Sequence, residues 1–348
     1  MKNSLGELAL SRDNHFQLLR LCAAGGVFVS HCFPLAGFGA TGKAALLGFI
    51  SLNVFFIVSG FLITRSFFAR SDPVSFIRSR ILRIYPALIV AVLFCVFLIG
   101  PAFTNQEWSD YFSDPAIYDY LIKNSFLFWP GIPESLPGVF LDSAYRPIVN
   151  APLWSLPYEV WCYTALFVSA MLLGAKKAPR LYFSLVGLVF VFFFGVFALN
   201  YSLNTTEYAV WLGKDAYRLG AMFMLGMLFY SLKNHIRISL VYAALIVVAI
   251  AVADQINATL YAVVAYAGLG YLVMCFAYAV KGPLLRFNSL GDYSYGIYIF
   301  GYPVQQAVEH IAPDLSLPVY FLVSLSITFL CAAFSWHLIE KRALLLKS

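Results

Sequence analysis

The chain contains few charged residues. Only 11% of its 348 residues are Asp, Glu, Lys or Arg, whereas an average soluble domain carries about 25%. A protein with so little charge cannot build a surface that faces water on all sides. This excludes a soluble globular enzyme, a disordered chain, a coiled coil and a nucleic-acid-binding domain. The hydrophobic content of 61% predicts a polytopic membrane protein instead.

Cysteine is also scarce, and the sequence shows no internal repeat. The six cysteines are scattered in or beside apolar runs, so they form neither a disulfide framework nor a metal-binding spacing. No cleavable signal is predicted, because Met1–Gln17 is polar with mixed charges and the first apolar run is long enough to stay attached as a helix. We expect one integral-membrane domain over residues 1–348, with no appended soluble domain and no metal.

Long apolar runs are what the chain has in abundance. Residues 44–64, 181–199, 257–280 and 315–339 carry no Asp, Glu, Lys or Arg, and a bilayer core takes roughly 20 residues to cross. With shorter runs between them, they predict an all-α membrane protein with about ten transmembrane helices. We expect these helices at residues 16–36, 44–65, 84–100, 152–174, 181–199, 215–232, 238–253, 257–280, 290–309 and 316–339.

Basic side chains indicate the orientation, because Lys and Arg in short loops stay on the cytoplasmic side. If the N-terminus is cytoplasmic, all of the 23 basic residues fall on the inner side except Lys43, Lys123, Arg146, Lys214 and Arg218. Both the N-terminus and the C-terminus are therefore predicted to be cytoplasmic.

The longest connection, at residues 101–150, is predicted to be one long ordered outer loop. It is rich in proline, acidic and aromatic residues, Trp108 and Trp129 among them. A loop of this length in a compact protein is usually functional or disordered. The aromatic side chains favour an ordered cap, in which they either stack on sugar rings or anchor the segment at the membrane interface, and the sequence does not prefer one of these roles.

Ionisable side chains inside apolar runs are costly and point to function. The first predicted helix carries Arg20 and His31, which project from one face because 11 residues at 100° each make almost a whole number of turns. The fourth predicted helix carries Glu159. Counting from the helix ends places Glu159 about 10 Å and His31 about 8 Å below the outer boundary. A carboxylate and an imidazole at one depth are typical of a general base and its orienting partner.

Each of these residues also has a plain structural interpretation. His31 is then a packing histidine between helices, Arg20 a snorkelling side chain near the end of its span, and Glu159 a carboxylate with a structural partner. A nucleophilic role for the neighbouring Cys32 is disfavoured, because adjacent helical residues do not face each other.

An arginine-rich segment, Phe76–Pro86, precedes the third predicted helix. It contains Arg78, Arg80 and Arg83, and the last two share a helix face. Guanidinium groups bind phosphate oxygens in bidentate fashion, so the segment predicts a phosphate-binding clamp. Topogenic charge is the alternative.

The remaining motifs are expected to pack helices or to line the site. Small and polar residues allow close approach of helices, and Asp292, before the ninth predicted helix, is expected to cap its N-terminus. The residues expected to pack or to line the site are Asn53, Ser59, Gly60, Phe61, Trp154 and Tyr295.

Taken together, these elements resemble the membrane-bound acyltransferase family 3, the carbohydrate O-acyltransferases of bacterial envelopes. The resemblance covers nearly the whole chain, and the order, spacing and membrane side of the motifs make it specific. The motifs are Arg20 with His31, Val54–Leu62, Arg83–Pro86, Trp154–Glu159, Leu290–Tyr298 and Ile339–Lys341.

The resemblance implies acyl transfer from cytoplasmic acyl-CoA, most often acetyl-CoA, to a hydroxyl of an envelope glycan such as O-antigen or exopolysaccharide. It also implies a multi-pass protein of the bacterial inner membrane. The expected partners are acyl-CoA, membrane lipids and a glycan acceptor, lipid-linked or free, with no nucleic acid and no metal.

Matched residue by residue, the family's first-helix pair falls on Arg20 and His31, its paired arginines on Arg80 and Arg83, and its acid on Glu159. One motif departs from the pattern. Many members have a histidine after the ninth-helix tyrosine motif, where this chain has Gly301. The role of that family histidine therefore cannot be assigned to Gly301.

The resemblance gives a hypothesis for the donor. Arg80 and Arg83, with Arg78 assisting, would hold the phosphates of CoA at the cytoplasmic side, and the pantetheine arm would pass Arg20 on its way to the reacting centre.

His31, oriented by Glu159, would then take the proton of the sugar hydroxyl that attacks the thioester, a role that suits its unperturbed pKa of about 6.5. Direct transfer and a pause of the acyl group on His31 both stay open. A transporter or flippase of a lipid-linked glycan is the rival function, although the sequence lacks the matching halves that transporters often show.

Overall fold

The computed structural model describes residues 4–11, 13–39, 42–69, 72–127, 131–143, 145, 147–203, 214–280 and 282–347. Over these residues the chain is helical, with two isolated β-bridges and no strand. The predicted all-α fold is confirmed.

Each predicted span coincides with a helix. In chain order these are α2 (Phe16–Leu35), α3 (Gly42–Ala69), α4 (Pro73–Phe94), α8 (Leu156–Leu172), α9 (Pro179–Leu203), α10 (Lys214–Ser231), α11 (Leu240–Ile256), α12 (Ala258–Ala279), α13 (Ser294–Ile311) and α14 (Leu317–Ser335). The shorter elements are α1 (Leu5–Leu8), the π-helical η1 (Cys95–Ile99), α5 (Gly100–Phe103), α6 (Trp108–Ser113), α7 (Pro115–Phe126), the 3₁₀-helical η2 (Ala151–Ser155) and η4 (Pro283–Ser289), the π-helical η5 (Trp336–Glu340) and α15 (Lys341–Leu345).

Several of these helices are long and apolar enough to cross a membrane. In the described part of the chain, six segments meet that condition: Phe16–Leu35, Gly42–Ala69, Pro73–Phe103, Pro179–Ser202, Ala258–Ala279 and Leu317–Leu345. Helices α8, α10, α11 and α13 lie where spans are predicted but are shorter or more polar. Their passage across the membrane, the count of ten spans and the cytoplasmic location of both termini stay predictions.

The predicted start of the third span lies later in the sequence than the observed start of the helix. The helix starts at Pro73 rather than at residue 84, because the Asp72 carboxylate caps it by accepting hydrogen bonds from the backbone N–H groups of Val74 (3.2 Å) and Ser75 (2.7 Å). Proline at the first helical position has the φ angle that a helix needs. The arginine-rich segment is therefore part of α4 and not a loop before it.

The chain divides into two compact units, which are described separately. Unit 1 comprises residues 1–20, 52–71 and 158–290, and unit 2 comprises residues 21–51, 72–157 and 291–348. Helices α2, α3 and α8 contribute residues to both units.

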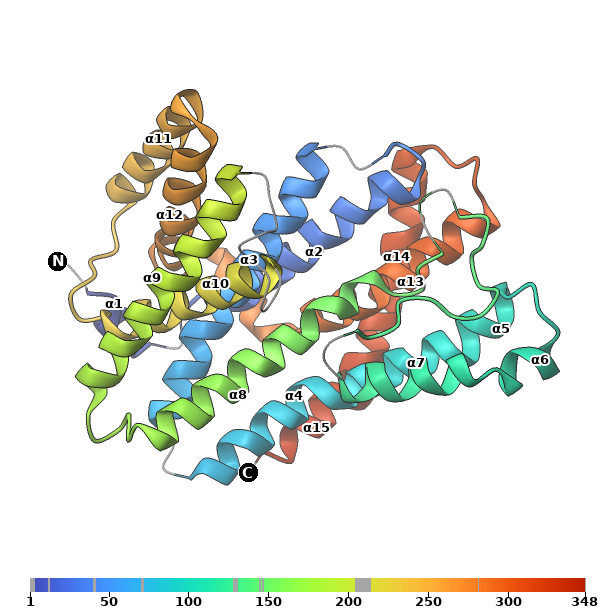
Figure 1. Cartoon of the computed structure of the whole chain (residues 1–348), viewed down its shortest axis with the longest axis horizontal. Coiled ribbons are helices and arrows are strands. Elements are labelled where there is room, and N and C mark those ends of the chain that lie inside the picture. The colour runs from blue at the N-terminus through green and yellow to red at the C-terminus, as the bar shows by residue number, and fades with distance from the viewer. Residues whose placement is uncertain are drawn as a thin grey trace. The chain divides into compact units, whose positions relative to one another are not determined.

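In unit 1, α11 packs beside α12, and α9 packs against α10 and α12 (Figure 1). Close contact between α3 and α10 depends on two glycines. A Cβ atom on Gly60 would lie 2.0 Å from the carbonyl oxygen of Phe223, and one on Gly226 would lie 2.2 Å from the carbonyl oxygen of Ile57. The two backbones approach so closely only because both positions lack a side chain.

Gly60→Ala is expected to destabilise the protein by about 3 kcal/mol, at the upper end of the range for overpacking, because the added methyl would overlap backbone atoms that cannot turn aside. The matched control is Gly195→Ala in α9, where no atom lies within 4 Å of the new Cβ. Thermal unfolding of the detergent-purified variants measures the difference. Equal melting temperatures for the two variants would contradict the tight α3–α10 contact.

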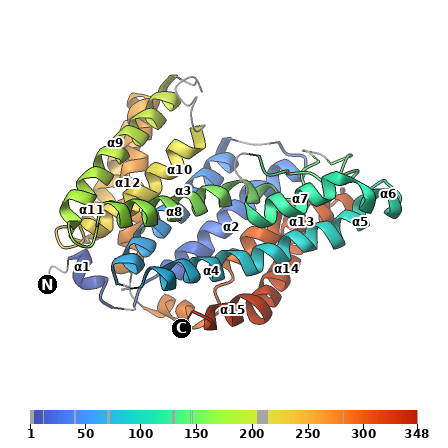
Figure 2. The same cartoon turned by 60° about the horizontal axis from the view of Figure 1, so that its bottom comes forward.

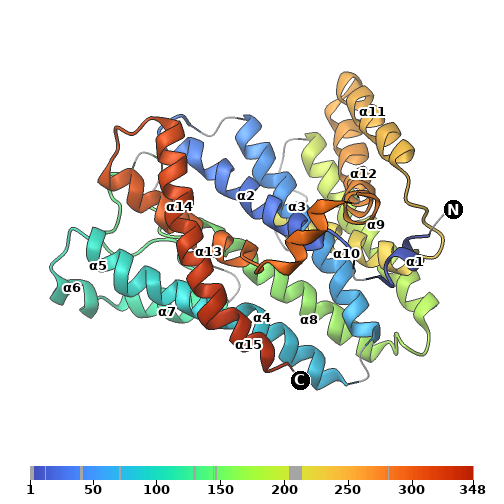
Figure 3. The same ribbon diagram turned by 180° about the vertical axis from the view of Figure 1, so that it is seen from behind.

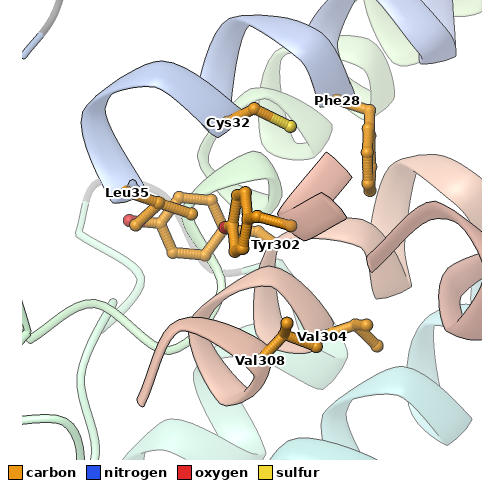
Figure 4. Packing of buried hydrophobic residues seen from close by; sticks show 7 residues of the cluster. Phe28, Cys32, Leu35, Tyr302, Val304 and Val308 are labelled. Carbon is orange, nitrogen blue, oxygen red and sulfur yellow. The ribbon is translucent and has the colours of Figure 1, made fainter. Parts of the chain in front are cut away.

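In unit 2, α13 is buried along most of its length and packs against α14, α4, η1 and η2, while α15 packs against α4 (Figure 3). Its sequence explains the burial, since the helix carries no charged residue before Glu309. Figure 4 shows the contact that α13 makes with α2: Phe28, Cys32 and Leu35 lie along α2, and Tyr302 lies on α13 within the same cluster of buried residues.

Residues 101–150 contain helices as well as turns. Their described residues include α5, α6 and α7, and α7 packs along α4 in unit 2 (Figure 2). The Trp108 side chain is 67% exposed, whereas Trp129 lies outside the described residues. The predicted ordered segment therefore combines short helices with turns, and its position outside the membrane stays a prediction.

Tyr111 joins this segment to the π-helical turn at the end of α4. Its hydroxyl donates a hydrogen bond to the carbonyl oxygen of Val96 at 3.0 Å. Burial raises the pKa of Tyr111 well above its ordinary value, so the hydroxyl stays protonated and remains a donor. Gly100 makes room for this ring, because a Cβ atom there would overlap the Tyr111 hydroxyl.

Candidate active site

His31 lies in the part of α2 that belongs to unit 2. Its ring meets the ring of Tyr302 on α13 edge to face, with centroids 5.1 Å apart and planes at 85°. Pro34, one turn later, has no N–H to give to the carbonyl of Ser30. The regular hydrogen bonding of α2 is thus interrupted beside His31.

Cys32 turns its thiol toward α13. The side-chain amide of Gln305 donates to the Cys32 sulfur at 2.9 Å and to the carbonyl oxygen of Phe28 at 3.0 Å. The thiol is buried and hydrogen-bonded to α13, and the expectation that Cys32 is not a nucleophile stays a prediction.

Glu159 is held by hydroxyl groups within unit 1. The hydroxyl of Tyr163, one turn along α8, donates to Oε1, and the Ser59 hydroxyl of α3 donates to the same oxygen at 3.3 Å. The Tyr163 hydroxyl also lies 3.4 Å from the Ser59 hydroxyl. Two neutral donors orient the carboxylate without neutralising its charge. Ser59, expected to pack or to line the site, thus touches the predicted acid.

His31 and Glu159 belong to different units, so their pairing stays a prediction. Arg20 is half-buried at the last position of its segment of unit 1. Its role beside the pantetheine arm is likewise a prediction. What the structure describes is the immediate surroundings of the imidazole on α2 and of the carboxylate on α8.

The three arginines at the start of α4 have different surroundings. Arg78 is exposed. The Arg80 guanidinium donates to the Ser79 hydroxyl at 3.1 Å and lies 5.8 Å from the centre of the Phe76 ring.

Arg83 is paired with acids. Its guanidinium lies 2.6 Å from Asp292 and 3.7 Å from Glu340, and it stacks 5.8 Å from the centre of the Tyr295 ring. The Tyr295 hydroxyl in turn donates to the carbonyl oxygen of Ile84 at 3.0 Å. Arg83 therefore joins α4 to the start of α13 and to η5.

The predicted N-cap role of Asp292 is wrong. Helix α13 begins at Ser294 with Tyr293 at its N-cap position, and no side chain caps it. Asp292 instead accepts hydrogen bonds from Arg83 at 2.6 Å and from the Ser294 hydroxyl at 2.6 Å. A hydrogen bond between charged groups is about twice as strong as one between neutral groups, so the guanidinium outcompetes the backbone amides for the carboxylate.

Trp154 lies half-buried in η2, the turn that leads into α8. The next residue, Ser155, is hydrogen-bonded to the hydroxyl of Tyr298 at 2.6 Å, and that hydroxyl also donates to the carbonyl oxygen of Pro152 at 3.0 Å. These bonds attach the tryptophan-containing motif to α13.

Arg218 is a buried charge that the sequence analysis did not select. It lies on α10 and is 3% exposed. Its guanidinium donates to the carboxylate of Asp215 at 2.8 Å and to the side-chain oxygen of Asn53 on α3 at 2.8 Å. The signal was present, since Arg218 falls inside the predicted span 215–232. The same criterion of an ionisable group in an apolar run had selected Arg20 and Glu159.

Arg218→Ala is expected to destabilise the protein by about 3 kcal/mol, because it leaves the Asp215 carboxylate and the Asn53 amide without their shared partner. Arg218→Lys should recover part of the loss, since an ammonium keeps the charge but not the fork geometry. Thermal unfolding in detergent measures both variants. A melting temperature unchanged in Arg218→Ala would show that the bond between α3 and α10 contributes nothing.

The sequence was compared with known protein families and known proteins. A family profile described as an acyltransferase domain matches residues 13–337. The chain belongs to the acyltransferase 3 family. An O-acetyl transferase of Shigella phage Sf6 is 29% identical over 355 residues, which cover 96% of this chain and 97% of the relative. Nodulation protein 10 of Rhizobium leguminosarum bv. viciae is 27% identical over 369 residues, which cover 96% and 94%. No solved structure matches the chain significantly.

Membership of the acyltransferase 3 family makes the protein an O-acyltransferase by family. The matched range of this acyltransferase 3 protein runs from residue 13 to residue 337 and so contains every predicted site residue from Arg20 to Tyr295. Its apolar helices agree with a multi-pass membrane protein.

Proposed function

We propose that this acyltransferase 3 protein transfers an acetyl group from acetyl-CoA to a hydroxyl of a cell-envelope glycan in the bacterial inner membrane. The observation that carries the proposal is the placement of His31: the family profile covers the membrane helix α2, and there the imidazole lies against Tyr302 with a ring separation of 5.1 Å. The relative named O-acetyl transferase, aligned over 96% of the chain, supports acetyl as the transferred group.

The donor is expected to bind through the start of α4. Two carboxylates, Asp292 and Glu340, already balance the charge of Arg83, which therefore offers no surplus positive charge to a phosphate. We assign the phosphates of CoA to Arg78 and Arg80 instead. Arg83 then has a structural role, because it joins α4 to the start of α13 and to η5. This assignment modifies the expectation that Arg83 itself binds the phosphates of CoA.

The reaction needs a base for the attacking hydroxyl. The sugar oxygen forms a bond to the thioester carbonyl carbon while His31 takes its proton. The tetrahedral intermediate then expels CoA, and the protonated His31 returns that proton to the leaving sulfur, so that the products are an acetyl ester and CoA. Glu159 favours the protonated imidazole by its negative charge, and Ser59 and Tyr163 fix the orientation of the carboxylate.

The acceptor is expected to approach along residues 101–150. Their described part includes the exposed rings of Trp108 (67%), Tyr118 (55%) and Tyr145 (43%). Aromatic faces next to water are suited to stacking on sugar rings, and a lipid-linked glycan would bring such rings to the membrane surface. These exposed rings support a glycan acceptor over a small soluble alcohol.

The experiment that tests the function uses purified protein, acetyl-CoA labelled in the acetyl group, and polysaccharide from source cells that lack the gene. The expected result is label in the polysaccharide that mild base releases, as an ester requires, with one CoA thiol formed per acetyl group. A protein that moves lipid-linked glycan across a vesicle membrane and transfers no label would instead be a transporter or flippase, and the proposal would fail.

A further inference from the structure

Helix α13 runs without a break through Pro303 in its middle, and a proline inside a helix kinks it because the ring crowds the carbonyl four residues earlier. Proline has no N–H, so the carbonyl group of Ile299, four residues earlier, has no helical partner. The side-chain amide of Asn150 takes that position and donates to the Ile299 oxygen at 2.8 Å. Asn150 is 2% exposed, so this bond is made away from water, where an unpaired carbonyl would be costly.

The residue before this proline is Tyr302, whose ring meets the ring of His31 at 5.1 Å and 85°. The residue before that is Gly301, where the family resemblance leads one to expect a histidine. A Cβ atom at Gly301 would lie 3.0 Å from the Phe28 ring, so α2 lies close against this turn of α13. The helix thus presents no side chain at 301 and a buried aromatic ring at 302 to the turn that carries His31.

Gln305, two residues after the proline, holds the same turn of α2. Its amide donates to the carbonyl oxygen of Phe28 and to the Cys32 sulfur, the residues three before and one after His31. Its own backbone carbonyl accepts a hydrogen bond from the Tyr320 hydroxyl of α14 at 3.2 Å. Gln305 is fully buried and so can fix the rotation of α2 about its axis.

The other side of this part of α13 is attached to the segment before η2. The Gln306 amide donates to the carbonyl oxygen of Ile148 at 2.8 Å, and its side-chain oxygen accepts from the Ser143 hydroxyl at 2.8 Å. With Asn150, this gives α13 polar attachments on both sides of the proline. Polar bonds have defined directions and therefore set one orientation, which apolar packing alone does not.

We propose that Tyr302 and Gln305 are positioning residues of the transferase, which fix the orientation of the His31 ring, and that Asn150 preserves the proline kink of α13 on which both depend. The inference rests on the proposed function, because it concerns the base of that reaction. In this chain the Tyr302 ring meets His31, the proposed base, while position 301 carries no side chain. A misplacement of about 1 Å in a reacting group costs about 100-fold in rate, so small losses of orientation should be visible as lost turnover.

The first test compares variants of Tyr302 in the labelled acetyl-CoA assay. Tyr302→Leu removes the ring and is expected to lower kcat about 100-fold while the KM for acetyl-CoA stays within twofold. Tyr302→Phe keeps the ring edge and should retain kcat within threefold. Tyr182→Leu is the matched control, because Tyr182 is an equally buried tyrosine that lies in α9 of unit 1 and is hydrogen-bonded to Ser169 at 3.2 Å. Its kcat should stay near the wild-type value even where its melting temperature falls.

The second test uses Asn150. Asn150→Ala is expected to lower both kcat and the melting temperature. Adding Pro303→Ala supplies the missing N–H to the Ile299 carbonyl, so the double variant should regain the melting temperature while kcat stays low, since the kink is lost. A double variant that regains full kcat would show that Asn150 only satisfies a carbonyl, and the positioning role of the kink would be refuted.

A readout without turnover separates this inference from the proposed function. In protein labelled with ¹³C-histidine, the Tyr302 ring should shift the NMR signals of the His31 ring, and the shift should persist in Tyr302→Phe and vanish in Tyr302→Leu. A wild-type protein that shows this shift but transfers no acetyl group would refute the function and leave the ring contact standing. Unchanged His31 signals and unchanged kcat in Tyr302→Leu would refute the positioning role.

Discussion

Replacing His31 with alanine is expected to lower acetyl transfer to the glycan by about 10²–10⁴-fold, the usual contribution of a positioned general base. The imidazole is half-buried on α2 and faces Tyr302, and no other group in the proposed mechanism takes the proton of the sugar hydroxyl. The loss should appear in kcat, since the imidazole is not assigned to the binding of CoA. The measurement is the initial rate of label transfer from acetyl-CoA to polysaccharide.

The control for this variant is His235→Ala, which removes an exposed imidazole and should leave the rate unchanged. The amount of His31→Ala protein in the membrane and its melting temperature should both match those of the wild type. A His31→Ala protein that is well folded and still transfers acetyl groups at near wild-type rate would remove the base from the mechanism. A companion variant, Glu159→Gln, should reduce kcat less than His31→Ala does, because the carboxylate acts only by orienting and stabilising the imidazole.

Replacing Arg83 with leucine should cost about 3 kcal/mol of stability, the lower end of the range for breaking a buried ion pair. The variant leaves Asp292 and Glu340 close to each other without the guanidinium that now lies between them at 2.6 and 3.7 Å. Two facing carboxylates in a half-buried site repel each other. Thermal unfolding of the purified protein gives the size of the loss.

A second substitution tests the cause of that loss. In the double variant Arg83→Leu with Asp292→Asn, one of the stranded carboxylates becomes neutral, so part of the stability should return. Arg78→Leu, at an exposed position of the same helix, should change the stability by no more than about 0.5 kcal/mol. If Arg83→Leu melts like the wild type but has a much higher KM for acetyl-CoA, Arg83 would be a phosphate ligand after all.

The sequence predicts the helices well because hydrophobic runs of this length have one solution in a membrane. All ten predicted spans coincide with helices. The boundaries are predicted less well where polar residues belong to a helix, as at Pro73, since hydropathy does not register a capped polar turn. Hydropathy also does not predict the π-helical segments η1 and η5, because they differ from an α-helix only in local hydrogen bonding.

The candidate site is predictable residue by residue but not contact by contact. The criterion of an ionisable group in an apolar run finds His31 and Glu159, and it would have found Arg218. It does not reveal that Arg83 meets Asp292, because that contact joins residues 209 positions apart. For the same reason, only the structure could show that the predicted N-cap role of Asp292 is wrong.

The π-helical segment η5 affects how the C-terminal helix responds to changes in length. A π-helical turn holds more residues than an α-helical turn, so it absorbs one inserted residue while the helix beyond keeps its face. Glu340 is the last residue of this widened turn, and α15 follows directly and packs on α4. Deletion of Leu338 within this turn should therefore leave α15 docked on α4 and Glu340 beside Arg83, so that this part of the chain tolerates the loss of one residue.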